Sequence, residues 1–246
     1  MNSFIKVPNA LFNFEKIGNK AVREYPLKPI DLYVYLYLLA SDYKNESVKR
    51  KIKTIAERCN VKDNKTIHSS IQRLESMGLV SKTTRYNMFG FKVSNAYTVT
   101  VVPGDFFMLD RRHLNFKLGT SAFCIFVYLN RCSNSTFACP SVSKMANATG
   151  ISQPTIRQKI AELQQRLYLT KSFNFSEFGD NSNNHYFLNS YENRLYVLSI
   201  YRRIKRKGIK LFRKISIIKT KPSIKKMLGS FIFVNYGVGK LFPNTS

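Results

Sequence analysis

The sequence predicts a mainly α fold with small β hairpins (α+β class), built from two copies of one unit and followed by a basic C-terminal tail. Residues 142–169 have the pattern of two helices joined by a tight turn, residues 55–80 repeat that pattern, and a hairpin pattern follows each copy. The corresponding domains are 1–104, 105–192 and 193–246. A chain of 246 residues is long enough for two small domains with separate cores.

The clearer copy reads VSKMANATGISQPTIRQKIAELQQRLYL from residue 142. Gly150 marks the turn, and Ser152 can cap a second helix that has Pro154 in its first turn. Apolar residues at helical spacing line one face of that helix, and its other face is polar. This arrangement is typical of a helix-turn-helix, although any two antiparallel helices with a short turn produce a similar pattern.

The second copy lies ninety residues earlier in the chain. Ile55-Ala56 matches Met145-Ala146, and Val61 matches Ile151. After one extra turn residue, the apolar stripe of the second helix matches at an offset of 89. Two copies in register, in a very basic chain, favour paired DNA-binding modules.

The first unit begins with a short strand or arm over residues 4–8. Residues 30–40 follow Pro29 and predict a buried helix; their Tyr and Val content also suits a strand, but the repeat favours the helix. Helices over 52–59 and 65–77 complete a three-helix set that Gly78 ends. A hairpin over 80–102, with its turn near 87–90, makes this unit a winged helix.

The second unit starts at residues 106–109 after Pro103-Gly104 and repeats the order: a buried helix over 121–130, the helix-turn-helix, and a hairpin over 169–188. The polar tip of this hairpin, residues 179–184, has the composition of a turn. The tail alternates apolar and cationic residues at helical spacing. It suits a basic amphipathic helix, a segment that orders on a partner, or a solvated cationic extension.

The charge is strongly positive and uneven. Forty Lys and Arg residues face 14 Asp and Glu, which gives a net charge of +26 and a pI near 10.1. Residues 195–246 hold 13 of these cations and no acidic residue, so half of the net charge lies in the last fifth of the chain. Such a charge attracts polyanions, above all nucleic acid; an anionic membrane surface is the competing interpretation.

Other chemistries find little support in the sequence. The four cysteines form no C-x-x-C pair and suggest buried thiols in a reducing cytosol, so we expect no zinc or other metal. His68, His113 and His185 belong to no ligand motif, and the glycines near residue 239 do not form a phosphate-binding loop. Signal-peptide and membrane-spanning patterns are missing. We therefore expect a cytoplasmic protein that is not an enzyme and uses no cofactor.

The outer faces of the two second helices, the hairpins and the tail supply the candidate DNA contacts. Gln and Arg can read adenine and guanine, whereas Lys and Ser usually contact phosphates. Glu162 projects from the later helix and is expected to repel phosphate. The candidates are Lys65, Thr66, His68, Ser69, Gln72, Arg73, Arg85, Lys92, Gln153, Thr155, Arg157, Gln158, Lys171, Asn181, Asn183, Arg202, Arg203, Lys205, Arg206 and Lys207.

The segments FIKVPNALF and FFMLD…LNFKLGTSAFCIFVYLNRCSNSTFACPSVSKMANATGISQPTIRQKIAEL are similar to helix-turn-helix proteins of Firmicutes plasmids, phages and integrative elements, many of them replication initiators or their regulators. The resemblance covers residues 4–188, and the tandem winged-helix layout also resembles iteron-binding plasmid initiators. It implies binding to double-stranded DNA at an origin, contact with host replication proteins, and a homodimer formed through one module. The extra turn residue and the cationic tail depart from this pattern.

The leading hypothesis is therefore a sequence-specific replication initiator of a mobile element. A winged-helix transcriptional regulator has the same sequence features. The third hypothesis is a membrane- or partner-docking protein that acts through its basic tail. Among the possible partners, a membrane is the least favoured. A nicking initiator is disfavoured because no paired histidines are present.

Overall fold

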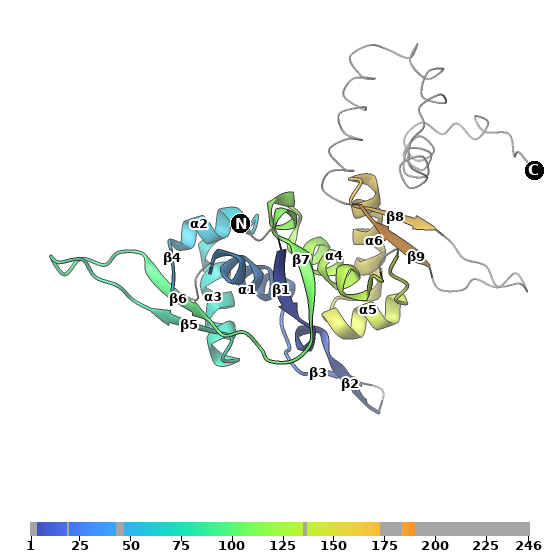
Figure 1. Ribbon diagram of the computed structural model, residues 1–246, viewed down its shortest axis with the longest axis horizontal. Coiled ribbons are helices and arrows are strands. Elements are labelled where there is room, and N and C mark those ends of the chain that lie inside the picture. Colours follow the sequence, from blue (N-terminus) through green and yellow to red (C-terminus); the bar gives the residue numbers. More distant parts are fainter. Residues whose placement is uncertain (1–3, 19, 43–46, 135–136, 173–183, 190–246) are drawn as a thin grey trace, which may run out of the picture. The chain divides into compact units, whose positions relative to one another are not determined.

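Helices and short antiparallel strands alternate along the chain in the computed structural model (Figure 1). The structure describes residues 4–18, 20–42, 47–134, 137–172 and 184–189. The chain divides into two compact units, Met1–Ile160 and Ala161–Ser246, and each is described by itself. The predicted tail helix lies outside the described residues. The fold is mixed, with small antiparallel sheets, and agrees with the predicted α+β class.

Helix α1 (Pro29–Ser41) lies at the centre of the first unit. Its side chains from Ile30 to Leu36, and Leu38, are buried, which confirms the predicted buried helix and excludes the alternative strand. The Tyr35 hydroxyl donates a hydrogen bond to the Thr100 carbonyl at 3.0 Å. A helix that is apolar on every side is stable only when other elements surround it.

Two helices and a three-stranded sheet cover one side of α1. Helix α2 (Ile52–Arg58) leads to α3 (Asn64–Ser76), where the Asp63 side chain accepts a hydrogen bond from the Lys65 amide at 2.9 Å and caps the helix. Gly78, at a φ of +71°, ends α3 as predicted. The predicted hairpin forms strands β5 (Val80–Thr83) and β6 (Asn95–Val99).

A third strand, β4 (Val48–Arg50), was not predicted. It pairs antiparallel with β6, so the strand order of this sheet is β4-β6-β5. Three residues are too few to show the period-two alternation by which a strand is recognised.

The other side of α1 packs against helix α4 (Thr120–Cys132), the predicted buried helix of the second repeat. The rings of Tyr33 and Phe123 stack between them, with centroids 3.8 Å apart and an angle of 13° between the planes. These two residues are ninety positions apart, which is the offset of the sequence repeat. The equivalent helices of the two repeats therefore meet at equivalent positions.

The strands that precede these helices also pair with each other. Strand β1 (Phe4–Pro8), predicted as a leading strand, forms an antiparallel ladder with β7 (Phe106–Asp110), and the two lie side by side in Figure 1. Short 3-10 helices follow both strands, at Asn9–Phe12 and Arg111–Phe116. Both predicted winged-helix domains thus contribute to the core of the first unit, and their limits at residues 104 and 192 stay predictions.

A second hairpin, β2 (Phe14–Ile17) with β3 (Lys20–Arg23), was not predicted. Arg23, at its end, donates hydrogen bonds to the Leu27 carbonyl at 2.7 Å and to the Thr149 carbonyl at 3.2 Å. Thr149 is the last residue of helix α5 (Val142–Thr149). The hairpin is therefore attached to the end of α5, directly before the turn at Gly150.

Helix α6 (Gln153–Gln165) crosses the limit between the units. In the second unit, the predicted hairpin forms strands β8 (Leu169–Ser172) and β9 (His185–Leu188), which pair antiparallel. Asn189 closes this hairpin, because its side-chain amide donates to the Leu167 carbonyl at 2.9 Å. Within the described residues, no helix has both the length and the apolar character needed to cross a bilayer.

Removing the stacked ring at the centre of the first unit should destabilise the protein. We expect Phe123→Ala to lower the free energy of unfolding by about 3–5 kcal/mol, because a fully buried ring is replaced by a cavity. Phe123→Leu, which keeps most of the volume, should cost less than about 1.5 kcal/mol. Urea unfolding curves measure both values, and equal stabilities of the two variants would contradict the central role of the stack.

The cysteines should differ in reactivity, since Cys139 is exposed whereas Cys59 and Cys124 are buried. Burial raises the pKa of Cys59 and that of Cys124 to about 12. The reactive thiolate is therefore scarce at about pH 8, and we expect rapid labelling of Cys139 and labelling of the buried pair only after unfolding. Cys139→Ser should remove the rapid phase of a colorimetric thiol assay. A rapid phase of unchanged amplitude in this variant would contradict the expectation.

Candidate nucleic-acid interface

The outer face of α3 carries the predicted contact residues of the first module. Its inner stripe of Ile67, Ile71 and Leu74 is buried against the core. The side chains on the opposite side of α3 therefore point away from the core. Thr66 lies half-buried at the edge of the stripe. The exposed polar residues on the outer face are Lys65, His68, Ser69 and Gln72.

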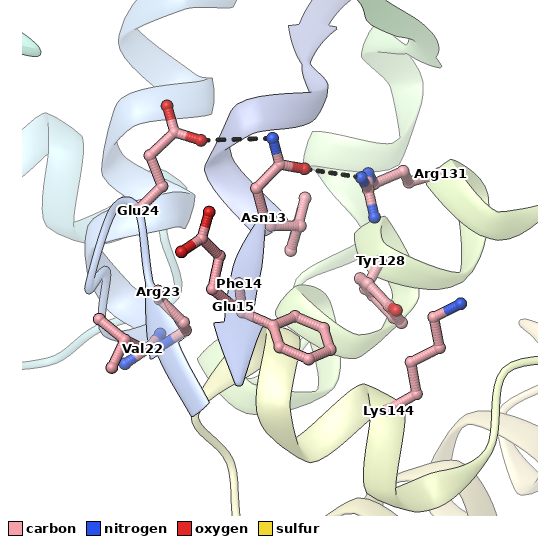
Figure 2. A pocket seen from close by; sticks show the side chains of 10 residues that line it. Asn13, Phe14, Glu15, Val22, Arg23, Glu24, Tyr128, Arg131 and Lys144 are labelled. Carbon is pink, nitrogen blue, oxygen red and sulfur yellow. Dashed lines mark hydrogen bonds between the residues drawn. The ribbon is translucent and has the colours of Figure 1, made fainter. Parts of the chain in front are cut away.

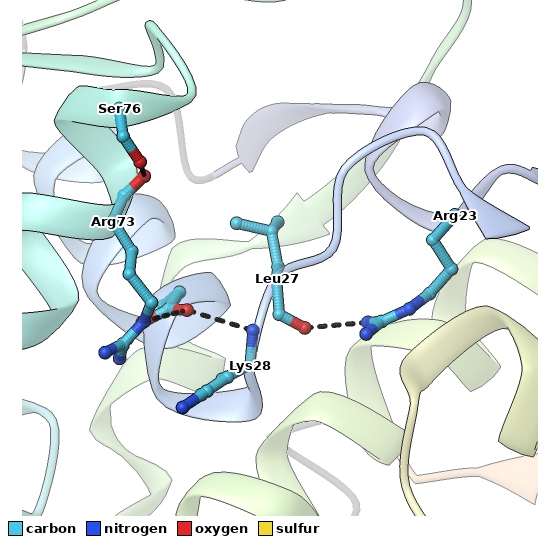
Figure 3. Close-up of polar contacts among 6 residues, drawn as sticks. Arg23, Leu27, Lys28, Arg73 and Ser76 are labelled. Carbon is cyan, nitrogen blue, oxygen red and sulfur yellow. Dashed lines mark hydrogen bonds and ion pairs between the residues drawn. The ribbon is translucent and has the colours of Figure 1, made fainter.

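Arg73 is only partly exposed beside this outer face, because its guanidinium pairs with a carboxylate of α1, and its predicted role in reading bases stays a prediction. Its Nε and Nη2 donate to the two carboxylate oxygens of Asp31 at 3.0 and 2.7 Å (Figure 3). Asp31 is fully buried in the first turn of α1, and it also accepts a hydrogen bond from the Lys28 amide at 3.0 Å. The hydrogen bonds with Asp31 raise the pKa of Arg73.

The physical reason for this pairing is that a buried carboxylate requires a cationic partner. Asp31 stands in the apolar stretch 30–38, and its nearest cation on α3 is at position 73. A bidentate ion pair fixes the guanidinium plane, so Arg73 joins α3 to α1. Sequence periodicity places Arg73 beside Gln72 but gives no information about this partner.

The second module presents its polar residues on the first turns of α6. Gly150 adopts a left-handed φ of +69° in the turn before the helix. The Thr155 hydroxyl lies 2.8 Å from that of Ser152, and Thr155 is half-buried. The exposed predicted residues on these turns are Gln153, Arg157 and Gln158.

Glu162 has a different environment from the one that the sequence suggests. Its carboxylate accepts a hydrogen bond from Arg166 Nη1 at 3.2 Å, one helical turn further along. The ion pair neutralises the charge that we expected to repel phosphate, although a partly exposed pair of this kind contributes little stability.

The predicted wing residues fall into two groups. Arg85 is half-buried and Lys92 is exposed on the facing arms of the β5–β6 hairpin, where Tyr86 and Lys92 form an isolated bridge. In the second hairpin, Lys171 is half-buried in β8. The remaining candidates lie outside the described residues: Asn181, Asn183, Arg202, Arg203, Lys205, Arg206 and Lys207.

Exposed cations near the first module were missed by the sequence prediction, among them two in β4. Lys49 and Arg50 lie in β4, opposite Ala96 and Asn95 of the wing. The run Lys49-Arg50-Lys51, directly before α2, is the signal that could have identified them. They add positive charge to the three-stranded sheet, whose strand β5 comes directly after α3 in the chain.

A cavity of about 680 Å³ lies between the β2–β3 hairpin and helices α4 and α5. Figure 2 shows Asn13 between Glu24 and Arg131: its amide donates to the Glu24 carboxylate at 3.3 Å, and its oxygen accepts from Arg131 at 3.0 Å. These bonds join the hairpin to α4. Among the described residues, no three His, Cys, Asp or Glu side chains are grouped so that they could hold a metal ion.

Comparison with known proteins identifies part of this arrangement. A family model described as a helix-turn-helix domain matches residues 117–169, from the connection before α4 to the first residue of β8. No curated protein matches the chain. The match includes α5, the turn at Gly150 and all of α6, and it supports a DNA-binding helix-turn-helix protein.

The ion pair of Arg73 with Asp31 leads to a stability prediction. Arg73→Ala leaves the buried Asp31 carboxylate without its cation, so we expect the free energy of unfolding to fall by about 3 kcal/mol. Arg73→Lys keeps the charge but loses the bidentate geometry, so its free energy of unfolding should fall less than that of Arg73→Ala. The neighbouring Gln72→Ala, on the exposed face, should stay within about 0.5 kcal/mol of wild type. Equal stabilities of Arg73→Ala and Gln72→Ala in urea unfolding would contradict the structural role of Arg73.

Proposed function

We propose that this protein is a sequence-specific double-stranded DNA-binding protein with two tandem winged helices, acting as the replication initiator of a plasmid, phage or integrative element. The observation that carries the proposal is the helix-turn-helix match over residues 117–169, in which α6 presents Gln153, Arg157 and Gln158 to solvent. In such a domain, the first residues of the second helix contact base edges in the major groove.

The first module supports the same function. Helices α2 and α3 follow the sequence repeat, and Asn60 in their turn has a left-handed φ of +54°, as Gly150 has in the other copy. The three-stranded sheet β4-β6-β5 supplies a wing directly after α3. Gln72 and Ser69 stand on the exposed face, and the surrounding Lys65, Lys49 and Arg50 can contact phosphates.

The net charge of +26 supports DNA as the partner of both modules. We infer that the two helices occupy successive major grooves roughly 10 bp apart, while the wings and tail add phosphate contacts. Binding is then electrostatic to a large extent, and its affinity falls steeply as salt rises. The protein binds DNA without changing it chemically.

Initiation, as opposed to transcriptional control, rests on the resemblance to initiators and regulators of mobile elements. In this role the protein binds repeats at an origin, forms a homodimer through one module, and recruits host replication proteins. A regulator with the same fold acts instead at an inverted repeat in a promoter. The arrangement of the bound sites therefore distinguishes the two roles.

Selection from a library of random duplexes with the full-length protein, at about 150 mM salt, tests the proposal. Enrichment of one motif is the expected result, and direct repeats of that motif beside a replication gene on the protein's own element identify an initiator. An inverted repeat at a promoter would replace initiation with regulation. Retention of all sequences equally would show that charge alone drives binding and would contradict sequence specificity.

The enriched duplex also tests the two outer faces. We expect Gln72→Ala and Gln158→Ala each to reduce discrimination against a single mismatched base pair by about 1–3 kcal/mol, because a side-chain amide can pair with an adenine edge. Gln165→Ala is the matched control, since Gln165 is exposed on the last turn of α6, far from the end that enters the groove. Competition binding with mismatched duplexes measures the effect, and a loss for Gln165→Ala equal to that for Gln158→Ala would contradict the assignment.

A further inference from the structure

The tip of the β5–β6 hairpin exposes large apolar side chains. Tyr86 is 64% exposed, Met88 91%, Phe89 73% and Phe91 70%. We call these four residues the wing-tip patch. Single exposed apolar residues are ordinary, but four within six positions on a projecting hairpin are unusual for a surface that contacts water alone.

Hydrogen bonds hold the tip in a defined shape. The Asn87 side-chain oxygen accepts from the amides of Phe89 at 3.0 Å and Phe91 at 2.9 Å. The backbone N–H of Asn87 donates to the Phe91 carbonyl at 2.9 Å, and Gly90 makes the turn with a φ of +78°. An aromatic group presented on a preorganised turn loses little conformational entropy when it binds.

The charge around the patch selects the chemistry of the partner. Arg85 and Lys92 flank it on the two arms of the hairpin, and the sequence contains no Asp or Glu between Glu75 and Asp105. The partner must therefore combine an anionic surface with apolar faces that accept aromatic rings. Nucleic acid offers both, since its phosphates border stacked bases.

The position of the hairpin supports the same partner. Strand β5 begins at Val80, close after the end of α3 at Ser76, and the hairpin projects beyond the helices (Figure 1). With the outer face of α3 in the major groove, a wing that starts from its C-terminal end reaches across the backbone towards the neighbouring minor groove.

We propose, on the basis of the DNA binding proposed above, that the wing-tip patch enters the minor groove. There Phe89 and Phe91 insert against one base step and partly unstack its two base pairs. Arg85 and Lys92 hold the phosphates on either side. Apolar wedges of this kind separate adjacent base pairs and bend the duplex towards the major groove. The first wing thus deforms the site that α3 reads, and base steps that unstack easily are favoured at its position.

The test uses the full-length protein and the duplex enriched by selection, or a mixed-sequence duplex if none is enriched. Permanganate reactivity of thymines reports unstacking, and energy transfer between dyes at the duplex ends reports bending. We expect the double variant Phe89→Ser/Phe91→Ser to abolish both signals and to weaken binding about tenfold. Because these side chains are exposed, the variant should fold, and its unfolding curve verifies this.

Phe106→Ala is the matched control, since Phe106 is a Phe of the same unit with 48% exposure, in β7 and outside the wing. It should leave the permanganate and energy-transfer signals unchanged. If the wild-type protein binds DNA without unstacking or bending it, the wedge is wrong, but the proposed function stands. A wild-type protein that binds no duplex overturns the proposed function as well.

Two other partners are separated by the same variants. If wild type, but not the double variant, binds vesicles of phosphatidylglycerol and phosphatidylcholine while DNA distortion is equal in both, the patch contacts membranes and the proposal is wrong. If the variant changes only the sedimentation behaviour of the protein without DNA, the patch contacts a second copy of the chain, and the proposal is likewise wrong.

Discussion

The packing of α1 against α4 is the interaction on which the rest of the first unit depends. Both helices are buried along most of their length, and the stacked rings of Tyr33 and Phe123 lie at their contact. Each helix therefore removes the other's apolar surface from water, which is the dominant favourable term in folding. Helices α2, α3 and α5, strand β6 and the β1–β7 ladder pack around this pair. Their polar faces point outward because their apolar faces have only this core to cover.

One carboxylate connects that core to the candidate interface. Asp31 accepts the Lys28 amide in the first turn of α1 and the guanidinium of Arg73 from α3. Together with the buried stripe of α3, this ion pair holds the helix in one rotation about its own axis. Gln72, one position earlier, then points to solvent. The side chain that reads DNA in our proposal is thus oriented in part by the ion pair of its neighbour.

Much of this fold could be predicted from the sequence because its signals are local. The stripe of Ile67, Ile71 and Leu74, the glycines at 78 and 150, and the long apolar runs of α1 and α4 all identify their elements without knowledge of the rest. Strand β4 and the β2–β3 hairpin were missed because strands of three or four residues carry too little periodicity.

The candidate site was less accessible to prediction for a different reason. Whether a polar residue on a helix faces DNA or a buried partner depends on residues far away in the chain. Arg73 lies 42 positions from Asp31, and no feature near either of them indicates the pair. The wing-tip patch shows the converse. The predicted turn near 87–90 places Phe89 at the tip, but large apolar residues are ordinarily buried, and only the structure shows how far Phe89 and Phe91 are exposed.

The α2–α3 turn and the α5–α6 turn are each attached to the opposite repeat. The Asn60 side chain donates to the Lys117 carbonyl at 3.2 Å, and a Cβ at Gly150 would lie 2.6 Å from Arg23 Nη2. Asn60 and Gly150 are equivalent positions of the repeat, yet the Asn60 side chain bonds to the other repeat, whereas a side chain at Gly150 would require the Arg23 guanidinium to move. If the chain arose by duplication, its halves have since become unequal and mutually dependent. A substitution at either turn must then be compatible with the residue that this turn contacts in the other repeat.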